Sequence, residues 1–197
     1  MKDWTGSRNS IFKAISASTN TSERQSADYY ATDPIAIHKL CTVEKFTPIV
    51  FEPACGGGHL VKALQERGYT VELSDIINRG YANTNIADFF DVAYSPNDII
   101  TNPPYKYAKE FVEHALDIVA NGRKVAMFLK LTFLEGKARQ KFFKENPQKK
   151  VWVFSERVLC AKNGDFEGLK ASGGSAVAYA WFIWEKGYQG ETTVGWI

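Results

Sequence analysis

Residues 49–58 read Ile-Val-Phe-Glu-Pro-Ala-Cys-Gly-Gly-Gly, and the architecture of the chain can be worked out from this stretch. Its three opening apolar residues are typical of a buried strand, and its glycines predict a tight turn. Apolar residues then recur at helical spacing from Leu60 to Leu64, and Gly68 fits the end of that helix. A strand that enters a helix through a glycine-rich turn is a unit of layered α/β folds.

The same alternation continues on both sides of this unit. Upstream, Asp33 and Pro34 are suited to the start of a helix. Downstream, the patterns predict strands at 70–73, 99–100, 125–129, 151–154 and 176–184, and helices at 106–120 and 136–145. The last two strands are separated only by a polar, glycine-rich stretch, 161–175, which indicates an antiparallel, hairpin-like end to the sheet. We therefore expect an α/β fold with a mainly parallel sheet and helices on both faces.

Length and composition favour one soluble domain, since the 197 residues are 45% hydrophobic. Residues 1–28 are polar, and we expect an arm there, with a short helix near 11–15, before a single domain at 29–197. The three cysteines, at 41, 55 and 160, form no zinc-binding spacing with the histidines, so no metal is expected. No signal peptide is evident, and the longest apolar run, 176–184, is too short to span a membrane, which predicts a cytoplasmic protein.

Two acidic residues, Glu52 and Asp75, follow expected strands, at the edge where ligands gather in such sheets, and a third, Asp88, comes next along the chain. Glu52 stands beside the glycines, where a carboxylate suits a cationic or hydroxyl-bearing ligand better than a pyrophosphate. Asp75 follows the second strand, a position at which an acid commonly binds ribose hydroxyls, although a helix cap is an equal alternative. Asp88 can accept from an adenine amine while the Phe89 ring stacks on the purine; a cap followed by a core residue is the alternative.

The most specific feature is Thr101-Asn102-Pro103-Pro104-Tyr105, at the end of another expected strand. Its two prolines remove two backbone donors and stiffen the chain, which frees the carbonyls of Asn102 and Pro103 to face a ligand. The Asn102 side-chain oxygen adds a third acceptor, and Tyr105 offers a flat face. Such a site suits a planar group with a protruding amine.

The order and content of these motifs resemble the S-adenosylmethionine-dependent amino methyltransferases, above all the DNA N6-adenine enzymes of the small phage and prophage type. The resemblance covers residues 29–186 and implies the Rossmann-like class I methyltransferase fold with a seven-stranded sheet. In this family a Thr-x-Pro segment, here 32–34, lies near the methionine carboxylate, and the Glu-Pro-Ala-Cys-Gly turn matches 52–56. The implied cofactor-binding residues are Tyr30, Thr32, Pro34, Glu52, Pro53, Ala54, Cys55, Gly56, Asp75, Ile76, Asp88 and Phe89.

The resemblance also implies how methyl transfer proceeds, with Asn102, Pro103, Pro104 and Tyr105 as the catalytic segment. Oxygens of Asn102 and Pro103 hold both N–H bonds of a flipped-out adenine, so that the nitrogen lone pair points at the methyl group of S-adenosylmethionine. Tyr105 stacks on the base, and Phe133 is expected on the opposite face of the base. No general base is evident, so the proton passes to water after transfer, and S-adenosylhomocysteine is the second product.

The charge distribution supports DNA as the partner. The net charge is only +2, but residues 121–170 hold twelve Lys and Arg against five Asp and Glu, whereas the remainder holds twelve against seventeen. Such a segment can follow phosphates, although solvated helix faces have the same composition. Only 13 residues separate Asp88 from Asn102 and only 13 follow Trp184, so no separate recognition domain and a short or relaxed specificity are expected. The expected substrate contacts are Lys130, Phe133, Lys137, Arg139 and Arg157.

Several alternatives remain open at this point. Adenine in structured RNA presents the same amine. Release-factor glutamine methyltransferases also use Asn-Pro-Pro-Tyr, because a side-chain amide offers a similar planar NH2, but they carry a further N-terminal helical domain for which 28 polar residues are too few. Cytosine N4 enzymes usually begin the motif with Ser and are disfavoured. A non-enzymatic nucleic-acid-binding protein with a lapsed site is disfavoured because Asn102, Tyr105 and Asp75 are intact.

Overall fold

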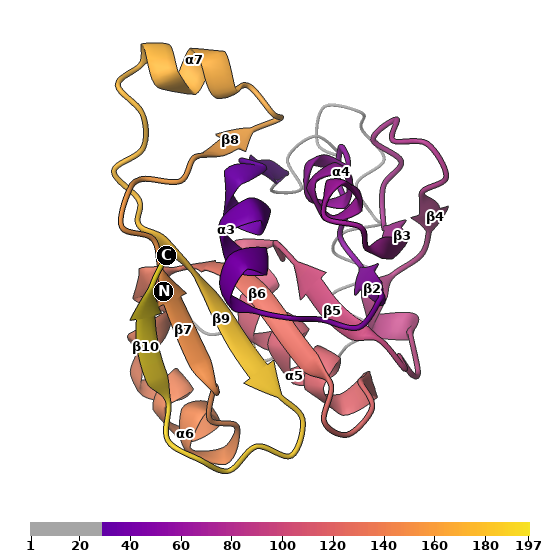
Figure 1. Cartoon of the computed structure of the whole chain (residues 1–197), viewed down its shortest axis with the longest axis vertical. Helices are drawn as coiled ribbons and strands as arrows, with labels where there is room; N and C mark the ends of the chain where they lie inside the picture. Colours follow the sequence, from indigo (N-terminus) through magenta and orange to yellow (C-terminus); the bar gives the residue numbers. More distant parts are fainter. Residues whose placement is uncertain (1–28) are drawn as a thin grey trace.

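The computed structural model describes residues 29–197, and its centre is an eight-stranded sheet flanked by helices (Figure 1). The expected arm at 1–28 and its short helix lie outside the described residues. Neighbouring strands pair in parallel except at β9, which runs antiparallel to both of its neighbours. In spatial order the strands are β10 (Thr193–Trp196), β7 (Lys150–Val153), β9 (Tyr179–Glu185), β6 (Lys124–Lys130), β5 (Asp98–Thr101), β2 (Ile49–Glu52), β3 (Thr70–Asp75) and β4 (Asn85–Ile86).

The expected mainly parallel sheet with an antiparallel C-terminal hairpin is confirmed, and the sheet has one strand more than predicted. This eighth strand, β10, extends the edge beyond β7 and pairs with it in parallel. Its sequence, Thr-Val-Gly-Trp, is too short and too mixed to indicate a strand. Gly195 is required there because a Cβ at this position would lie 2.3 Å from the Trp152 ring.

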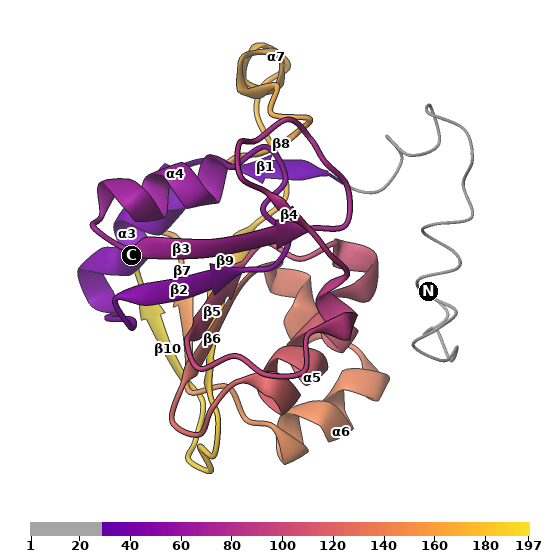
Figure 2. The same cartoon turned by 90° about the vertical axis from the view of Figure 1, so that its right-hand side faces the viewer.

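Helices cover both faces of the sheet, as Figure 2 shows most clearly. Helices α3 (Ile35–Val43) and α4 (His59–Glu66) lie on one face, and α5 (Ala108–Ile118) and α6 (Lys137–Glu145) lie on the other. The central strands β6 and β9 are therefore buried on both sides, which explains why their sequences are continuously apolar rather than alternating. Within residues 29–197, no helix combines the length and apolar character needed to cross a membrane.

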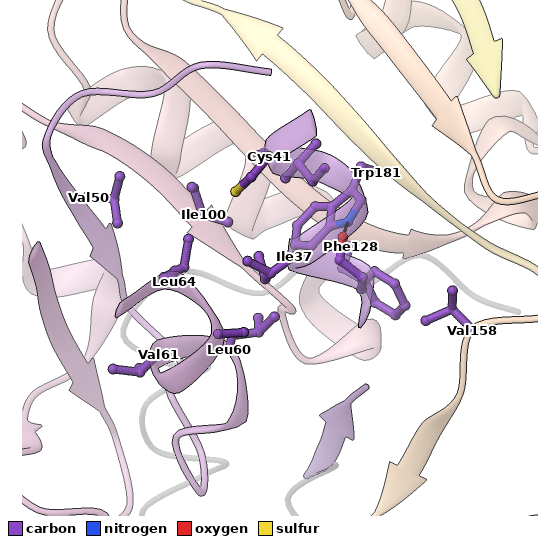
Figure 3. Packing of buried hydrophobic residues seen from close by; sticks show 14 of the residues in the cluster. Ile37, Cys41, Val50, Leu60, Val61, Leu64, Ile100, Phe128, Val158 and Trp181 are labelled. Atoms are coloured by element: carbon purple, nitrogen blue, oxygen red, sulfur yellow. Dashed lines mark hydrogen bonds between the residues drawn. The ribbon is translucent and has the colours of Figure 1, made fainter. Parts of the chain in front are cut away.

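The core beneath α3 and α4 is drawn in Figure 3. Trp181 of β9 and Phe128 of β6 are fully buried there, with ring centroids 5.4 Å apart. The Trp181 indole N–H donates to the Ala36 carbonyl (2.9 Å), so its one polar atom is satisfied inside the core. Truncating such a tryptophan to alanine costs about 3–5 kcal/mol. This packing fixes α3, and with it the strand that precedes α3, over the sheet.

A second, two-stranded sheet lies beyond the ends of the main strands, next to helix α7 (Phe166–Ala171) (Figure 1). In this sheet β1 (Tyr30–Thr32) pairs antiparallel with β8 (Cys160–Lys162). The stretch 161–175 thus contributes a strand and a helix, where the sequence predicts only a polar connection. The pairing joins segments about 130 residues apart and could not be read from local patterns.

Candidate functional site

Polar side chains from five neighbouring strands meet along one edge of the sheet, where the parallel strands end. In the sheet these strands lie in the order β4, β3, β2, β5 and β6. From β2 the chain adds strands toward one edge of the sheet, and from β5 it adds strands toward the other edge, so the strand order reverses between β2 and β5. Ligands bind at such a reversal point in open α/β sheets. We call Glu52 and Asp75, which end β2 and β3, and Asp88, which follows β4, the acidic flank. We call the segment 101–105, which begins at the last residue of β5, together with Lys130, which ends β6, the amide flank.

Glu52 ends β2 and is completely buried. Its Oε1 accepts a hydrogen bond from the Ala54 N–H (3.0 Å), while Oε2 and the nearby Thr101 hydroxyl have no partner of acceptable geometry. Burial raises the pKa of Glu52 to about 8, the proximity of the Thr101 hydroxyl and the bond from Ala54 oppose the shift, and the charge of Asp75 adds to it. A buried carboxyl with a spare oxygen suits a cationic or hydroxyl-bearing group, because such a group would compensate its lost hydration.

Asp75 ends β3 and fastens the glycine-rich turn to that strand. Its Oδ2 accepts from the Gly56 N–H (2.8 Å) and its Oδ1 accepts from the Ile77 N–H (2.9 Å). Burial raises the pKa of Asp75, and these two N–H donors together with Arg79 oppose the shift. Each carboxylate oxygen has a second lone pair, so the backbone bonds leave Asp75 able to accept from ligand hydroxyls.

Tyr29 covers the glycine-rich turn, a contact that sequence reasoning missed. Its hydroxyl accepts from the Gly57 N–H (2.8 Å) and lies 3.1 Å from His59 Nδ1. The ring lies so close to the turn that a Cβ at Gly56, where φ is +54°, would come within 2.1 Å of it. A glycine is therefore needed at 56 for both conformation and space. The signal available in the sequence was an aromatic residue next to the expected cofactor residue Tyr30.

Asp88 caps the short 3-10 turn at Phe89–Asp91, its Oδ1 accepting from the Phe90 N–H (3.0 Å). Burial raises the pKa of Asp88 as well. Phe89 is only 2% exposed, and its ring packs against Phe111 and His114 at centroid distances of 4.9 and 4.8 Å. The prediction that the Phe89 ring stacks on a purine is not supported, because the ring is buried among neighbouring side chains. Of Asp88 and Phe89, Asp88 is the one whose half-buried side chain can contact a ligand.

The other expected cofactor residues lie where the motifs place them. Pro53, Cys55 and Gly56 are buried in the turn between β2 and α4, while Ala54 in the turn, Ile76 beside Asp75 and Pro34 at the start of α3 are half-buried. Burial raises the pKa of the Cys55 thiol to about 11, so the thiol is neutral and serves packing. Along the described part of the chain, no group of three His, Cys, Asp or Glu side chains could hold a metal ion.

Asn102 follows β5 and is held through its side-chain nitrogen. Nδ2 donates to the Tyr30 carbonyl and to Thr32 Oγ1, both at 2.9 Å and both on β1. The side-chain oxygen Oδ1 is buried and has no hydrogen-bond partner. A buried amide oxygen without a donor costs free energy, so the arrangement leaves one acceptor ready for a donor from a ligand.

Tyr105 is the last residue of the segment 101–105 and lies within a group of aromatic side chains. Its ring stacks on Tyr179 at 5.9 Å and lies 6.0 Å from Tyr30. Its hydroxyl is 3.0 Å from Cys160 Sγ, and the Lys130 ammonium lies 4.8 Å from the ring centroid. Burial raises the pKa of Tyr105, which keeps the phenol neutral. The structure therefore brings Lys130 next to Tyr105, and its role as a substrate contact stays a prediction.

Phe133 does not lie opposite Tyr105 as expected. It belongs to the core between the sheet and α6, with ring centroids 5.6 Å from Phe182 and 5.8 Å from Phe143. Its ring packs among apolar side chains in the core, as is common for phenylalanine, and is not available to stack on a base. Arg139 covers this cluster, since its guanidinium donates to the Thr132 carbonyl (3.2 Å) and lies 5.1 Å from the Phe133 ring. Sequence reasoning could not distinguish a core phenylalanine from a base-stacking one.

The remaining expected substrate contacts, Lys137 and Arg157, are exposed, on α6 and between β7 and β8. Four lysines of the basic segment are instead engaged in ion pairs: Lys124–Glu44, Lys141–Glu145, Lys149–Glu185 and Lys170–Glu167. These ion pairs neutralise part of the positive charge of residues 121–170.

A scan of protein-family models finds no match to this sequence, and a search of curated proteins finds none. Solved structures are nonetheless similar. A candidate class I S-adenosylmethionine-dependent methyltransferase of Listeria monocytogenes, lmo1582, is 14% identical with a TM-score of 0.55, over 96% of this chain and 71% of that one. Atu636 of Agrobacterium tumefaciens, a predicted O-methyltransferase, is 12% identical with a TM-score of 0.57, over 83% and 85%.

The type IIG restriction endonuclease BpuSI is also similar, with 15% identity and a TM-score of 0.58. The match covers 89% of this chain but only 28% of BpuSI. At these identities the comparisons show the fold, which is the Rossmann-like class I methyltransferase fold that the sequence predicted.

Proposed function

We propose that this protein transfers a methyl group from S-adenosylmethionine to the exocyclic N6 amine of adenine in DNA. The observation that carries the proposal is the state of Asn102, whose NH2 is bound by Tyr30 and Thr32 while its oxygen is buried without a partner. An acceptor fixed in this way, at the reversal point of a methyltransferase fold, fits a planar amine that donates two N–H bonds.

The acidic flank fits the cofactor. Glu52 has a buried, unpartnered oxygen that suits the amino group of the methionine moiety, and Asp75 suits the ribose hydroxyls. Asp88 is the proposed acceptor for the adenine amine of the cofactor, and the backbone of 53–56 with Ile76 completes the cradle. When bound, S-adenosylmethionine supplies an electrophilic methyl group on its sulfonium.

The amide flank fits the target amine. Asn102 Oδ1 and the Pro103 carbonyl would each accept one N–H of that amine, which favours a pyramidal nitrogen with its lone pair free. The same oxygens stabilise the positive charge that develops on nitrogen as the new bond forms, and this differential stabilisation accelerates transfer. Tyr105 would stack on the extruded base. The Asn102 amide cannot take a proton, so we propose that the proton leaves to water after transfer.

The choice of nucleic acid as the polymer rests on charge near the amide flank. Lys130 lies 4.8 Å from the Tyr105 ring, and Lys106 and Lys162 are exposed on the segments next to Tyr105 and Cys160. An extruded nucleotide has a phosphate on each side, and positively charged side chains around a base pocket can bind these phosphates. The restriction endonuclease among the similar structures agrees with DNA as the substrate. We further propose that the enzyme has a short or relaxed specificity, with target contacts made by loops and exposed lysines.

The test is transfer of a labelled methyl group to DNA, structured RNA and a release factor in parallel, followed by hydrolysis and chromatography. We expect label in N6-methyladenine from DNA. Label in N6-methyladenine only from RNA, or in methylglutamine, would replace the proposed substrate, and no transfer to any of them would overturn the proposed activity. Sequencing of methylated plasmid DNA would test specificity, because a single long target motif contradicts recognition by loops.

A further inference from the structure

Two side chains from opposite ends of the chain meet on one side of the Asn102 amide. In the small sheet, Thr32 of β1 pairs directly with Cys160 of β8, so both side chains project from the same face. Thr32 is 2% exposed and Cys160 is 6% exposed. Asn102 Nδ2 lies 2.9 Å from Thr32 Oγ1 and 3.5 Å from Cys160 Sγ.

A third group decides which way round the amide sits. The Tyr30 carbonyl, 2.9 Å from Asn102 Nδ2, can accept a hydrogen bond but cannot donate one. If the amide oxygen and nitrogen were exchanged, two acceptors would face each other at Tyr30, and the NH2 would point toward the target amine, which also donates. The Tyr30 carbonyl therefore selects the orientation in which Oδ1 is available, and the side chains of Thr32 and Cys160 hold Nδ2 in that place.

We propose that Thr32 and Cys160 are positioning residues, which lock the Asn102 amide in the orientation that the reaction requires. The role is distinct from the cofactor contact that the family resemblance implied for Thr32, because here the hydroxyl accepts from Asn102. The Cys160 thiol also lies 3.0 Å from the Tyr105 hydroxyl, so the same cross-strand pair reaches both functional side chains of the amide flank. The kinetic consequence rests on the function proposed above; the lock itself does not.

The kinetic arm compares Thr32→Val, which keeps the shape and removes the acceptor, with Thr32→Ser, which keeps the acceptor. We expect Thr32→Val to lower kcat by roughly tenfold, since small misplacements of a reacting group have effects of this order and larger. Thr32→Ser should stay near the wild-type rate, and both variants should bind S-adenosylmethionine as the wild type does. Thr42→Val, on the surface of α3, serves as the control for replacing a threonine hydroxyl by a methyl group.

Two kinetic results would overturn the proposal. Equal kcat in Thr32→Val and Thr32→Ser would mean that the hydroxyl does not position Asn102. Weaker binding of S-adenosylmethionine with an unchanged kcat would return Thr32 to the cofactor site. If Thr32→Val does not fold, as judged by thermal unfolding, the same comparison is made between Cys160→Ala and Cys160→Ser.

The second arm needs no activity and separates failure of the lock from failure of the proposed function. In 15N-labelled protein, the Asn102 NH2 signals are identified by their loss in Asn102→Ala. We expect hydrogen exchange of these protons to be slow in the wild type and in Thr32→Ser, and at least several-fold faster in Thr32→Val. Equal exchange in all three proteins would overturn the lock. Slow exchange in a wild type that transfers no methyl group would retain the lock and reject the function.

Discussion

The acidic flank and the amide flank hold their polar groups by opposite means. Glu52, Asp75 and Asp88 each accept an N–H from a residue two positions further along the chain. Asn102 is instead held by Tyr30 and Thr32, which are 72 and 70 residues away. Backbone N–H groups thus hold the three carboxyl groups of one flank, mostly within local turns, although Asp75 also accepts from Gly56, 19 residues away. Distant segments orient the neutral amide of the other flank. We infer that the first flank serves the cofactor and the second serves the target amine.

The largest effect is expected from Gly56→Ala, in the glycine-rich turn that Asp75 of the acidic flank holds. The new Cβ would lie 2.1 Å from the Tyr29 ring, at a residue with φ of +54°. We expect a loss of about 2–4 kcal/mol of unfolding free energy, from strain and displacement of the ring together. Denaturant unfolding measures it. Gly68→Ala is the control, since its φ is +86° with open space around it, and should cost about 1 kcal/mol; equal losses would mean that Tyr29 moves away freely.

Glu52→Gln should weaken binding of S-adenosylmethionine roughly tenfold to a hundredfold, because a charged hydrogen bond to the ligand amino group is lost. Isothermal titration calorimetry gives the dissociation constants. Glu66→Gln is a suitable control, as Glu66 is exposed on α4 and paired with His38. Unchanged affinity in Glu52→Gln would remove Glu52 from the cofactor site and weaken the division between the flanks.

The affinity of the wild type for S-adenosylmethionine should depend on pH. Burial raises the pKa of Glu52 to about 8, so the free protein holds this carboxyl protonated at neutral pH. A cationic amino group binds the ionised form, and binding must then release a proton. We expect the dissociation constant to fall as pH rises from about 6 to 7.5, by at most about tenfold per pH unit. Calorimetry in buffers of different ionisation enthalpy detects the proton, and Glu52→Gln should show neither effect.

The smallest effect is expected at Phe133, which the structure places in the core rather than on the amide flank. Phe133→Leu should lower the unfolding free energy by about 1 kcal/mol, as a shape change in a packed cluster does. The rate of methyl transfer should not change. Tyr105→Leu, assayed beside it, should slow transfer because Tyr105 belongs to the amide flank. A slower reaction in Phe133→Leu at full stability would return Phe133 to the base pocket.

The contrast between the flanks also explains how much could be predicted from the sequence. The glycine-rich turn and the three acids could be found from local patterns, and each acid has one local backbone contact. The bonds of the turn to Asp75 and Tyr29 are long-range and could not be predicted in this way. The pairing of β1 with β8 is long-range, so the contacts of Tyr29, Thr32 and Cys160 could not be read from spacing. Whether the rings of Phe89 and Phe133 face the core or a ligand depends on what packs against them, and composition carries no such information.

Asn102→Ala tests the central claim most directly, when methyl transfer to DNA and binding of S-adenosylmethionine are measured on the same preparation. Asn97→Ala, just before the other end of β5, is the matched control. The proposed division predicts that the rate of transfer falls at least about a hundredfold, as it does when an enzyme loses one group that stabilises the charge of the transition state. The dissociation constant of the cofactor should stay within about twofold of the wild-type value. Transfer at the wild-type rate, or a loss of cofactor binding as large as the loss of transfer, would contradict it.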